Sequence, residues 1–432
     1  MDTIKIGLLG CGTVGSGVVK LLAKNATEIA LKTGSRLEIK KILVKDPLKK
    51  RDGSIPADIL TTKADDILED PEIKIVVELI GGIEPAKDYI LKSLEQGKNV
   101  VTANKDVLAA HGQDIFKLAN EKGKDLLFEG SVGGGIPIIL PLRSSLAGNK
   151  ISRILGIVNG TTNYILTKMS MENREFSEAL AEAQALGYAE ADPSADVDGL
   201  DAARKIAILA SIAFQTDISI DDVYVEGITG ISSFDIVYAK ELGFVIKLLG
   251  VATEKTEGIE VRVHPVMLPV THPLAAVNDV FNAVFIEGDG VGQAMFFGPG
   301  AGEFPTASSI IGDLMLVAKH LKLGVTGKLT ECKFLYEKSV LPIGELISSY
   351  YIRLLVLDQP GVLAKIAGIL ADHKVSIASV LQKRTLDDLA EIVLVTHQVK
   401  EANFSDALNR IRAIPFVKAV DSVIRVDLSS NK

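Results

Sequence analysis

The chain opens with a short apolar run that ends in a glycine-rich turn, and this feature constrains the fold more than any other. Residues Ile4–Leu9 are rich in Ile and Leu, and the run stops at Gly10. Apolar residues then recur at helical spacing from Val14 to Leu22. This segment is therefore predicted to form a strand, a tight turn and a helix.

The same alternation continues along the N-terminal third of the chain. Strands that alternate with helices are typical of a parallel sheet. We therefore expect an α/β fold in which residues 1–135 form a Rossmann-type nucleotide-binding domain. The further strand-like runs are 37–44, 73–80, 100–102 and 125–128, and the helical stretches include 85–96 and 112–122.

The pattern changes beyond residue 135, and residues 136–305 are predicted to form an α+β domain for substrate binding and dimerisation. An amphipathic helix over 306–323 could return to the first domain. Here the predicted helices are 177–186 and 199–214, followed by strands at 260–268, 283–287 and 293–297.

The C-terminal part of the chain has an element order of its own. Residues 324–349 contain scattered Gly, Lys and Pro and are interpreted as a linker. Residues 350–428 give strand, helix, strand, strand, helix, strand, which is typical of a small ferredoxin-like domain.

Composition narrows the classes of partner. The chain has 432 residues, more than one core usually serves, and a net charge of -8 that is spread along it. This charge and the 5% aromatic content argue against nucleic acid and anionic membranes as partners. Cys11 and Cys332 lie in no metal-ligand spacing, and the first residues enter a strand without a leader-like apolar core, so a cytoplasmic location is expected.

The glycine turn predicts a dinucleotide site. Gly10, Gly12 and Gly15 would allow a tight turn, close approach of a pyrophosphate and close helix packing. Thr13 and Val14 open the helix, whose N-terminus attracts negative charge. The alternative is a tight turn that binds no ligand.

The loop after the second predicted strand bears on the choice between NAD and NADP. Asp46 could bind the ribose hydroxyls of NAD, whereas Lys49 and Arg51 could bind the 2′-phosphate of NADP. Both cofactors remain open at this point, and so does a solvated charged loop without a ligand.

An acidic segment before a predicted helix carries the candidate reaction chemistry. Asp201 and Lys205 are four residues apart and share one helical face. Reduction of a carbonyl by a nicotinamide requires a proton, which a lysine ammonium can supply. A surface salt bridge between the two residues is the alternative. The other acids of the segment are Glu190, Asp192, Asp196 and Asp198.

Several stretches together resemble homoserine dehydrogenase. The resemblance implies the reversible reduction of L-aspartate 4-semialdehyde to L-homoserine with NAD or NADP, in the route to threonine and methionine. The acidic segment is the most specific of the matching stretches, which are GLLGCGTVGSG, Thr102–Lys105, Glu129–Pro137, Asn159–Tyr164 and the residues ending in Lys205.

The resemblance also implies residue roles. Lys205 would be the proton donor, and Glu190 and Asp201 would hold the substrate. Lys105 would lie beside the nicotinamide and the substrate, although an ordinary exposed lysine is the alternative. Gly187 is a further expected substrate contact, and Thr102 and Gly302 are further expected cofactor contacts.

Two more sites are implied by the resemblance. The loop that begins at Glu129 would bind Na⁺ or K⁺ through Glu129 and the carbonyls of Val132, Gly134 and Ile136, with a flexible hinge as the alternative. The C-terminal segment resembles an ACT domain, which would pair with a second copy and bind an effector at Asp358, Gly361 and Val362. L-Threonine is the expected effector, and a homodimer or homotetramer is the expected assembly.

The same chain contains features of two rival functions. Tyr164 and Lys168 match the YxxxK spacing of short-chain reductases, but those enzymes have a GxxxGxG turn, whereas this chain has GxGxxG. A catalytically inactive nucleotide-binding amino-acid sensor is the second rival. The presence of both Asp201 and Lys205 argues against it.

Overall fold

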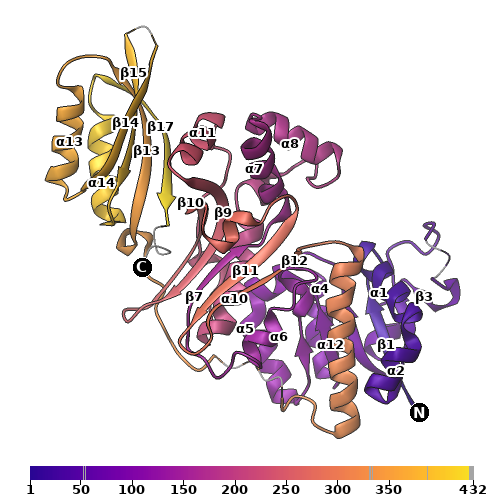
Figure 1. Cartoon of the computed structure of the whole chain (residues 1–432). Coiled ribbons are helices and arrows are strands. Elements are labelled where there is room, and N and C mark those ends of the chain that lie inside the picture. Colours follow the sequence, from indigo (N-terminus) through magenta and orange to yellow (C-terminus); the bar gives the residue numbers. More distant parts are fainter. Residues whose placement is uncertain (52, 54, 330–331, 333, 387, 428–432) are drawn as a thin grey trace. The chain divides into compact units, whose positions relative to one another are not determined.

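The computed structural model describes residues 1–51, 53, 55–329, 332, 334–386 and 388–427 (Figure 1). The chain divides into two compact units, each assembled from separate segments. Unit 1 comprises Met1–Ile154, Arg204–Asp222 and Asn282–Lys338. Unit 2 comprises Leu155–Ala203, Val223–Phe281 and the described residues from Ser339 onward. Among the described residues, no helix combines the length and apolar character that crossing a lipid bilayer requires.

Unit 1 is built on a parallel sheet, which confirms the predicted α/β fold. The order is β3-β2-β1-β4-β5-β6, and each neighbouring pair is parallel. Ile6, Leu8 and Val76 are almost completely buried, as expected for strands covered on both faces. The strands are β1 (Asp2–Leu9), β2 (Ser35–Leu43), β3 (Leu60–Thr61), β4 (Ile73–Glu78), β5 (Asn99–Thr102) and β6 (Leu126–Leu127).

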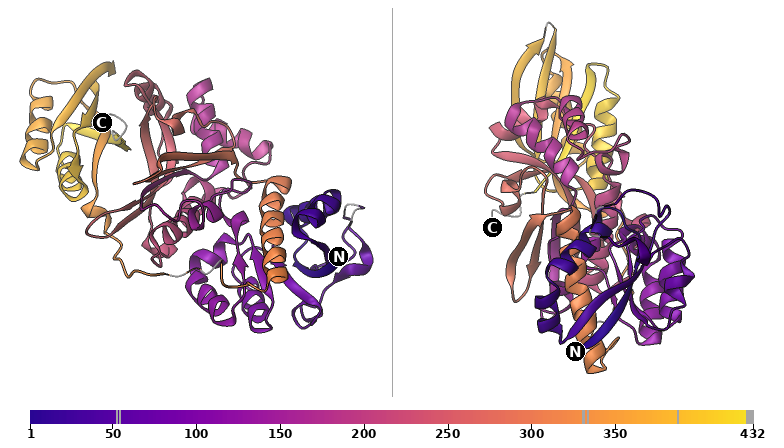
Figure 2. Two further views of the ribbon diagram at one scale, coloured as in Figure 1. Left: turned by 60° about the horizontal axis from the view of Figure 1, so that its bottom comes forward. Right: turned by 90° about the vertical axis from the view of Figure 1, so that its right-hand side faces the viewer.

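Helices cover this sheet, and one of them comes from much later in the chain. Helix α12 (Glu303–Leu323) lies beside α1 (Thr13–Lys24) in both views of Figure 2. Its Ile310 and Leu314 join the same buried cluster as Leu8. The other elements of this unit are α2 (Ala26–Thr33), α3 (Asp65–Leu68), α4 (Ala86–Glu95), α5 (Lys105–Lys122), α6 (Ile139–Arg143), β11 (Phe281–Gly288) and β12 (Gly292–Pro299).

Helix α5 begins earlier than the predicted helix 112–122. Asn104 caps it by accepting a hydrogen bond from the Val107 amide, so the helix starts at Lys105. Its backbone leaves helical geometry at His111. The predicted helix therefore corresponds to the part of α5 that follows this kink.

Unit 2 combines the middle of the chain with its C-terminal region. Helices α7 (Gly160–Glu172) and α11 (Ser233–Glu241) were missed by the sequence analysis. In α7 the polar residues Thr161, Asn163 and Thr167 are buried together with apolar ones, so the buried positions do not stand out as an apolar stripe in the sequence. The remaining elements from the middle of the chain are α8 (Phe176–Ala185), α9 (Ser194–Val197), β8 (Tyr224–Val225), β9 (Phe244–Glu254) and β10 (Ile259–Pro269). Two further elements, β7 (Ile151–Ile157) and α10 (Leu200–Phe214), contain residues of both units.

The C-terminal region has the predicted strand and helix order, with one short strand added. Strand β13 begins at Ile347, so the end of the predicted linker 324–349 already lies in a strand. The elements are β13 (Ile347–Leu357), α13 (Val362–Asp372), β14 (Ile377–Leu386), β15 (Leu389–Thr396), β16 (Val399–Lys400), α14 (Glu401–Arg412) and β17 (Val417–Val426).

The sheet of this region continues into the middle of the chain. The strand order in unit 2 is β9-β10-β17-β13-β15-β14. Strand β17 pairs in parallel with β10 at two positions, Val266 with Arg425 and Met267 with Val426. The Asp427 amide then donates to the Met267 carbonyl at 3.0 Å. The C-terminal region is therefore part of one compact unit with the middle of the chain.

A buried arginine strengthens this association. The guanidinium of Arg353 on β13 donates to Asp235 on α11 at 2.9 Å and to Glu391 at 3.1 Å. It also reaches Asp421 at 3.2 Å and the Ser232 hydroxyl at 3.1 Å. Asp235 is fully buried, so its charge depends on this partner.

We expect Arg353→Met to lower the free energy of unfolding of unit 2 by about 3–5 kcal/mol, because Asp235 and Glu391 would remain buried without their cation. Lys400→Met, which removes an exposed ion pair with Glu345 in the same unit, should lower this free energy far less. Urea unfolding followed by circular dichroism would compare the two. Equal losses would contradict the assigned role of Arg353.

Candidate active site

The glycine turn has the geometry that a pyrophosphate site needs. Gly10 has φ of 99°, and a Cβ there would lie 2.7 Å from the Leu79 carbonyl oxygen at the end of β4. A Cβ on Gly15 would lie 2.5 Å from the Gly10 carbonyl oxygen, whereas a Cβ on Gly12 would meet no atom within 4 Å. Gly10 and Gly15 thus let the backbone pack closely, and Gly12 faces open space. The N-terminus of α1, with Thr13 and Val14, carries no side-chain cap and keeps its amides available.

A buried carboxylate organises the ends of β4 and β5. Glu78 accepts hydrogen bonds from the Ile80 amide and the Thr102 hydroxyl, both at 2.7 Å. The amide nitrogen of Asn104 approaches it at 3.4 Å and donates to the Gly82 carbonyl at 2.8 Å. Burial raises the pKa of Glu78, and these donors oppose that rise. Glu78 therefore fixes the turn that leads into Lys105, and the sequence analysis did not identify it.

The helices that carry the two candidate lysines are linked. Lys105 is the first residue of α5, and Lys205 lies in the second turn of α10. Their neighbours Asp106 and Arg204 form an ion pair of 3.0 Å. This pair joins the beginnings of two helices about a hundred residues apart in sequence, which is why no local pattern could have indicated it.

One amide holds two carboxylates of the acidic segment. The Asn159 side-chain nitrogen donates to Asp196 at 2.6 Å and to Asp201 at 2.9 Å. The Asn159 oxygen accepts from the Thr162 amide and caps α7, so the orientation of the side-chain amide is fixed. Asp201 is buried and lies one helical turn before Lys205 in α10. The structure thus brings Asp196 and Asp201 together at the start of the helix that bears Lys205.

The loop with Gly187 and Glu190 is held through its backbone. The Thr161 hydroxyl donates to the Tyr188 carbonyl at 2.7 Å, and the Gln184 amide donates to the Glu190 carbonyl at 3.0 Å. Gly187 has φ of 76° after α8, and the Glu190 side chain is exposed. The fold therefore anchors the main chain of this loop and leaves the Glu190 carboxylate at the surface of unit 2.

A buried lysine supports the other side of α7. Lys247 donates to the Val277 carbonyl at 2.5 Å and to the Asn163 oxygen at 3.1 Å. Burial lowers the pKa of Lys247 to about 8. The segment that follows Val277 lies against α7, because a Cβ on Gly160 would be 2.8 Å from the Val280 carbonyl oxygen. The stretch Asn159–Asn163 therefore serves as a scaffold for the acidic segment.

The loop that begins at Glu129 gives its carboxylate three partners from the backbone. Glu129 accepts hydrogen bonds from the amides of Ile138 at 2.5 Å, Ile139 at 2.8 Å and Leu140 at 2.7 Å. Burial raises the pKa of Glu129. Because the carboxylate already has these donors, a cation would have to be held mainly by carbonyl oxygens. The Gly134 carbonyl also accepts the Ser309 hydroxyl at 2.7 Å.

A buried amide lies beside the segment that carries Gly302. Asn282 is 1% exposed, and neither of its side-chain polar atoms has a hydrogen-bond partner among the described residues. A Cβ on Gly300 would collide with its oxygen, so Gly300 is required there. Gly302 itself has φ of 126° and precedes α12. A Cβ on Gly134 would lie 2.5 Å from the Gly300 carbonyl oxygen, so the two glycine-rich segments are in contact.

The charged loop after β2 folds back on itself. Arg51 donates to the carbonyls of Asp46 at 2.8 Å and Lys49 at 3.0 Å, while Asp46 accepts from the Leu48 amide. Lys49 is exposed. These contacts hold Asp46, Lys49 and Arg51 in one loop at the carboxyl end of β2, so both candidate determinants of cofactor choice occupy the same loop.

The YxxxK pair has a different role. The Tyr164 hydroxyl donates to Glu182 on α8 at 2.6 Å. Lys168 pairs with Glu172 at 2.6 Å and with Glu182 at 3.3 Å. The pair therefore fastens α7 to α8.

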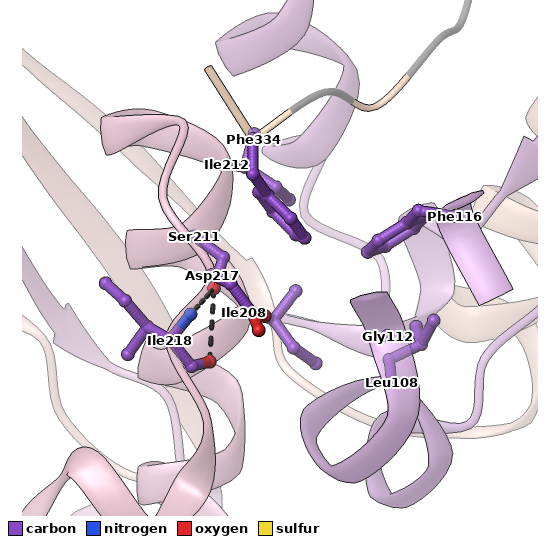
Figure 3. A pocket seen from close by; sticks show the side chains of 9 residues that line it. All are labelled: Leu108, Gly112, Phe116, Ile208, Ser211, Ile212, Asp217, Ile218 and Phe334. Atoms are coloured by element: carbon purple, nitrogen blue, oxygen red, sulfur yellow. Dashed lines mark hydrogen bonds between the residues drawn. The ribbon is translucent and has the colours of Figure 1, made fainter. Parts of the chain in front are cut away.

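The small cavity in Figure 3 is too small for the substrate or the cofactor. It lies between Phe334, Phe116 and residues of α5 and α10, and it encloses about 20 Å³, enough for about one water molecule. Phe116 and Phe334 meet edge to face with ring centres 5.9 Å apart. The cavity is a packing gap beside the segment that leads to the C-terminal region.

The candidate effector turn combines a left-handed glycine with an uncapped helix. Gly361 has φ of 91° and no side chain caps α13, which begins at Val362. The Asp358 amide donates to the Asp388 carbonyl at 2.8 Å, and the Asp358 side chain is exposed. Asp358, Gly361 and Val362 thus lie together before α13.

Comparison with known families assigns each part of the chain. Residues 10–129 match the NAD-binding domain model of homoserine dehydrogenase, residues 137–315 match the homoserine dehydrogenase model, and residues 350–416 match the ACT domain model. The homoserine dehydrogenase of Bacillus subtilis is 45% identical over 99% of both chains. That of Synechocystis is 47% identical over 98% of this chain and 99% of its own.

Solved structures agree. A homoserine dehydrogenase structure from Thiobacillus denitrificans has a TM-score of 0.95 at 41% identity and covers 99% of both chains. A hyperthermophilic archaeal homoserine dehydrogenase in complex with NADPH has a TM-score of 0.63 at 28% identity and covers 74% of this chain and 98% of its own. The glycine turn, the acidic segment and the matches along the whole length lead to one conclusion: this chain belongs to the homoserine dehydrogenase family.

Proposed function

We propose that this member of the family reduces L-aspartate 4-semialdehyde reversibly to L-homoserine with Lys205 as the proton donor. When bound, the nicotinamide supplies the hydride. The Lys205 ammonium then gives a proton to the aldehyde oxygen as that oxygen gains negative charge, and the reverse reaction returns the proton to Lys205. The arrangement at Asn159, which fixes Asp196 and Asp201 at the beginning of the helix bearing Lys205, is the observation that carries this proposal.

The substrate carries an ammonium and a carboxylate, which gives the acidic residues a role. We assign Asp201 and Glu190 to the substrate ammonium, because carboxylates form strong charge-assisted hydrogen bonds with it. Gly187 lets the chain turn into the loop that presents Glu190. Lys105 begins α5 at the end of β5, where ligands bind in parallel sheets, and is assigned to the nicotinamide and substrate. A purely sensory role is not favoured, because the family models match the catalytic portion.

We expect Lys205→Ala to lower kcat for homoserine oxidation by roughly 10²–10⁴-fold while NADPH affinity changes little, because the change removes a positioned proton donor. Absorbance of NADPH gives the rate, and fluorescence titration gives the affinity. Lys240→Ala, an exposed lysine outside the proposed site, is the control. Turnover near that of the unaltered enzyme would refute the assignment.

Cofactor choice is proposed to depend on the loop after β2. The double change Lys49→Ala and Arg51→Ala should raise the dissociation constant of NADPH roughly 10-fold or more and that of NADH much less. Only NADPH has a 2′-phosphate that can pair with these cations. Dissociation constants for the two cofactors provide the measurement, with Lys32→Ala on α2 as the control. If the dissociation constants of both cofactors rise equally, the loop does not bind the 2′-phosphate.

A monovalent cation is proposed at the loop that begins at Glu129. Glu129 and the carbonyls of Val132, Gly134 and Ile136 would hold Na⁺ or K⁺, while the three amides that donate to the Glu129 carboxylate fix the loop. Such an ion would stabilise the contact between this loop and the segment carrying Gly300 and Gly302. Replacing Na⁺ and K⁺ by choline in the homoserine assay should lower the rate, and an unchanged rate would exclude a required ion.

Regulation by an amino acid is proposed for the ACT region. The amides before α13 could hold the effector carboxylate and Asp358 its ammonium. Millimolar L-threonine should slow homoserine oxidation, and Asp358→Asn should weaken that response, whereas Asp372→Asn at the other end of α13 should not. If no amino acid of the pathway changes the rate or the melting temperature, the effector site is absent.

Assembly into a homodimer or homotetramer stays a prediction. Met295 and Phe297 on β12 are 42% and 53% exposed, which gives unit 1 apolar surface that a second copy could cover. Light scattering on the purified chain would give the mass, and a monomeric mass would contradict the prediction.

A further inference from the structure

Arg425, at the end of β17, lies between two carboxylates and two tyrosine rings. Its guanidinium donates to both oxygens of Glu401 at 3.1 Å and to Glu226 at 2.8 Å. The guanidinium carbon is 5.1 Å from the centre of the Tyr224 ring and 6.0 Å from that of Tyr350. The Arg425 side chain is 8% exposed, so these interactions are largely shielded from water.

Glu401 and Tyr350 tie this arginine to the ACT region. The Tyr350 hydroxyl donates to Glu401 at 2.6 Å, and its ring stacks on Phe404 of α14 with centres 3.8 Å apart. Glu401 is the first residue of α14. Arg425 is therefore part of the ACT region, because it lies on β17 and forms two hydrogen bonds with Glu401 of α14.

Glu226, in contrast, belongs to a segment that contacts the turn at Val197 and Asp198 of the acidic segment, called here the acidic turn. The Glu226 amide donates to the Val263 carbonyl, and the Ile228 amide donates to the Val197 carbonyl, both at 2.8 Å. Gly227 allows direct backbone contact, since a Cβ there would lie 2.2 Å from the Val197 oxygen and 2.6 Å from the Asp198 Cα. Any displacement of this segment would therefore displace the turn at Val197 and Asp198.

The acidic turn leads directly to the residues assigned to the substrate. Val197 ends α9, and Asp201 lies in the first turn of α10, where it accepts the Asn159 amide. Asp196, one residue before Val197, accepts the same amide. The turn is thus held by Asn159 on one side and by the segment from Glu226 to Ile228 on the other.

We propose that the ion pair between Arg425 and Glu226 is a positioning contact through which the ACT region sets the substrate-holding turn. This inference rests on the proposed function, because it takes Asp201 and its neighbours as the substrate site. Arg425 and Glu226 are positioning residues, since they act on the substrate only through the backbone at Val197 and Asp198.

The attachment of β17 explains why this contact can transmit a change. Among the described residues, β17 pairs with β10 at Arg425 and Val426 alone, whereas it pairs with β13 along most of its length. The ACT region is therefore joined to β10 at one end of one strand, next to the ion pair. A small change in the angle of β17 moves the Arg425 guanidinium while the long pairing inside the ACT region stays intact. The ion pair would then pass this movement to Glu226 and to the segment that contacts Val197 and Asp198.

Glu226→Gln and Asp421→Asn form a matched pair of variants. Each removes one carboxylate from a buried arginine that keeps another carboxylate partner, and the side chains are 38% and 30% exposed. Only Glu226 belongs to the segment that contacts the acidic turn. A loss of stability alone would affect both variants in the same way.

We expect Glu226→Gln to raise the KM for L-homoserine roughly 3- to 10-fold, with kcat within about 2-fold and the KM for NADP unchanged. The rate response to millimolar L-threonine should weaken as well. Asp421→Asn should leave the KM for homoserine and the response unchanged. Steady-state kinetics on the full chain, with the melting temperature of each variant, supply these values.

The inference is overturned if Glu226→Gln has the homoserine KM of the unaltered enzyme, or if both variants shift it equally. Asp201→Asn and Glu190→Ala separate this result from a failure of the proposed function. If those two changes raise the homoserine KM while Glu226→Gln does not, only the positioning role is wrong. If Asp201→Asn and Glu190→Ala leave the KM unchanged, the assigned substrate site itself is wrong.

Discussion

The bond from one amide to two carboxylates is the interaction on which the candidate site depends. Asp196 and Asp201 repel each other, and both are held by the two hydrogens of the Asn159 nitrogen. Hydrogen bonds to charged groups contribute about 1.5–3 kcal/mol, enough to offset such repulsion at a partly buried site. Because Asn159 also caps α7, the position of the acidic segment is tied to the start of that helix. Two further contacts hold the surroundings of Asn159. Lys247 contacts Asn163 of α7, and the segment that begins at Glu226 contacts Val197 and Asp198.

Secondary structure could be predicted from the sequence wherever interactions between neighbouring residues determine it. Five strands of the parallel sheet were predicted to within a few residues, and for the ACT region the order of the elements was predicted without their bounds, because periodicity and glycine turns are properties of neighbouring residues. Prediction from the sequence failed where tertiary contacts determine which residues are buried or where a helix bends. Helix α7 buries three threonines and Asn163, which look like surface residues, and α5 is interrupted at His111.

The candidate site was predictable in its motifs but not in its supports. The glycine turn and the pair Asp201 and Lys205 were identified from spacing and from a family resemblance. Glu78, the pair of Asp106 with Arg204 and the pair of Arg425 with Glu226 join residues far apart in the chain, so a single sequence contains no signal for them. The three backbone amides that donate to the Glu129 carboxylate come from Ile138, Ile139 and Leu140, and no spacing in the sequence indicates them.

The continuous sheet through β10 and β17 has a consequence for how the ACT region can be studied. A chain that ends before Ser349 would keep the pairing of β10 with β9 but would leave the other edge of β10, near Val266, without its neighbouring strand. An exposed strand edge is a template for pairing with another chain, so such a fragment is prone to aggregation. It would also bring Asp235, buried under Arg353, into contact with water. Altered activity of the fragment would therefore reflect the loss of the strand pairing and buried ion pairs that join the two regions, and a simple release from regulation could not be inferred from it.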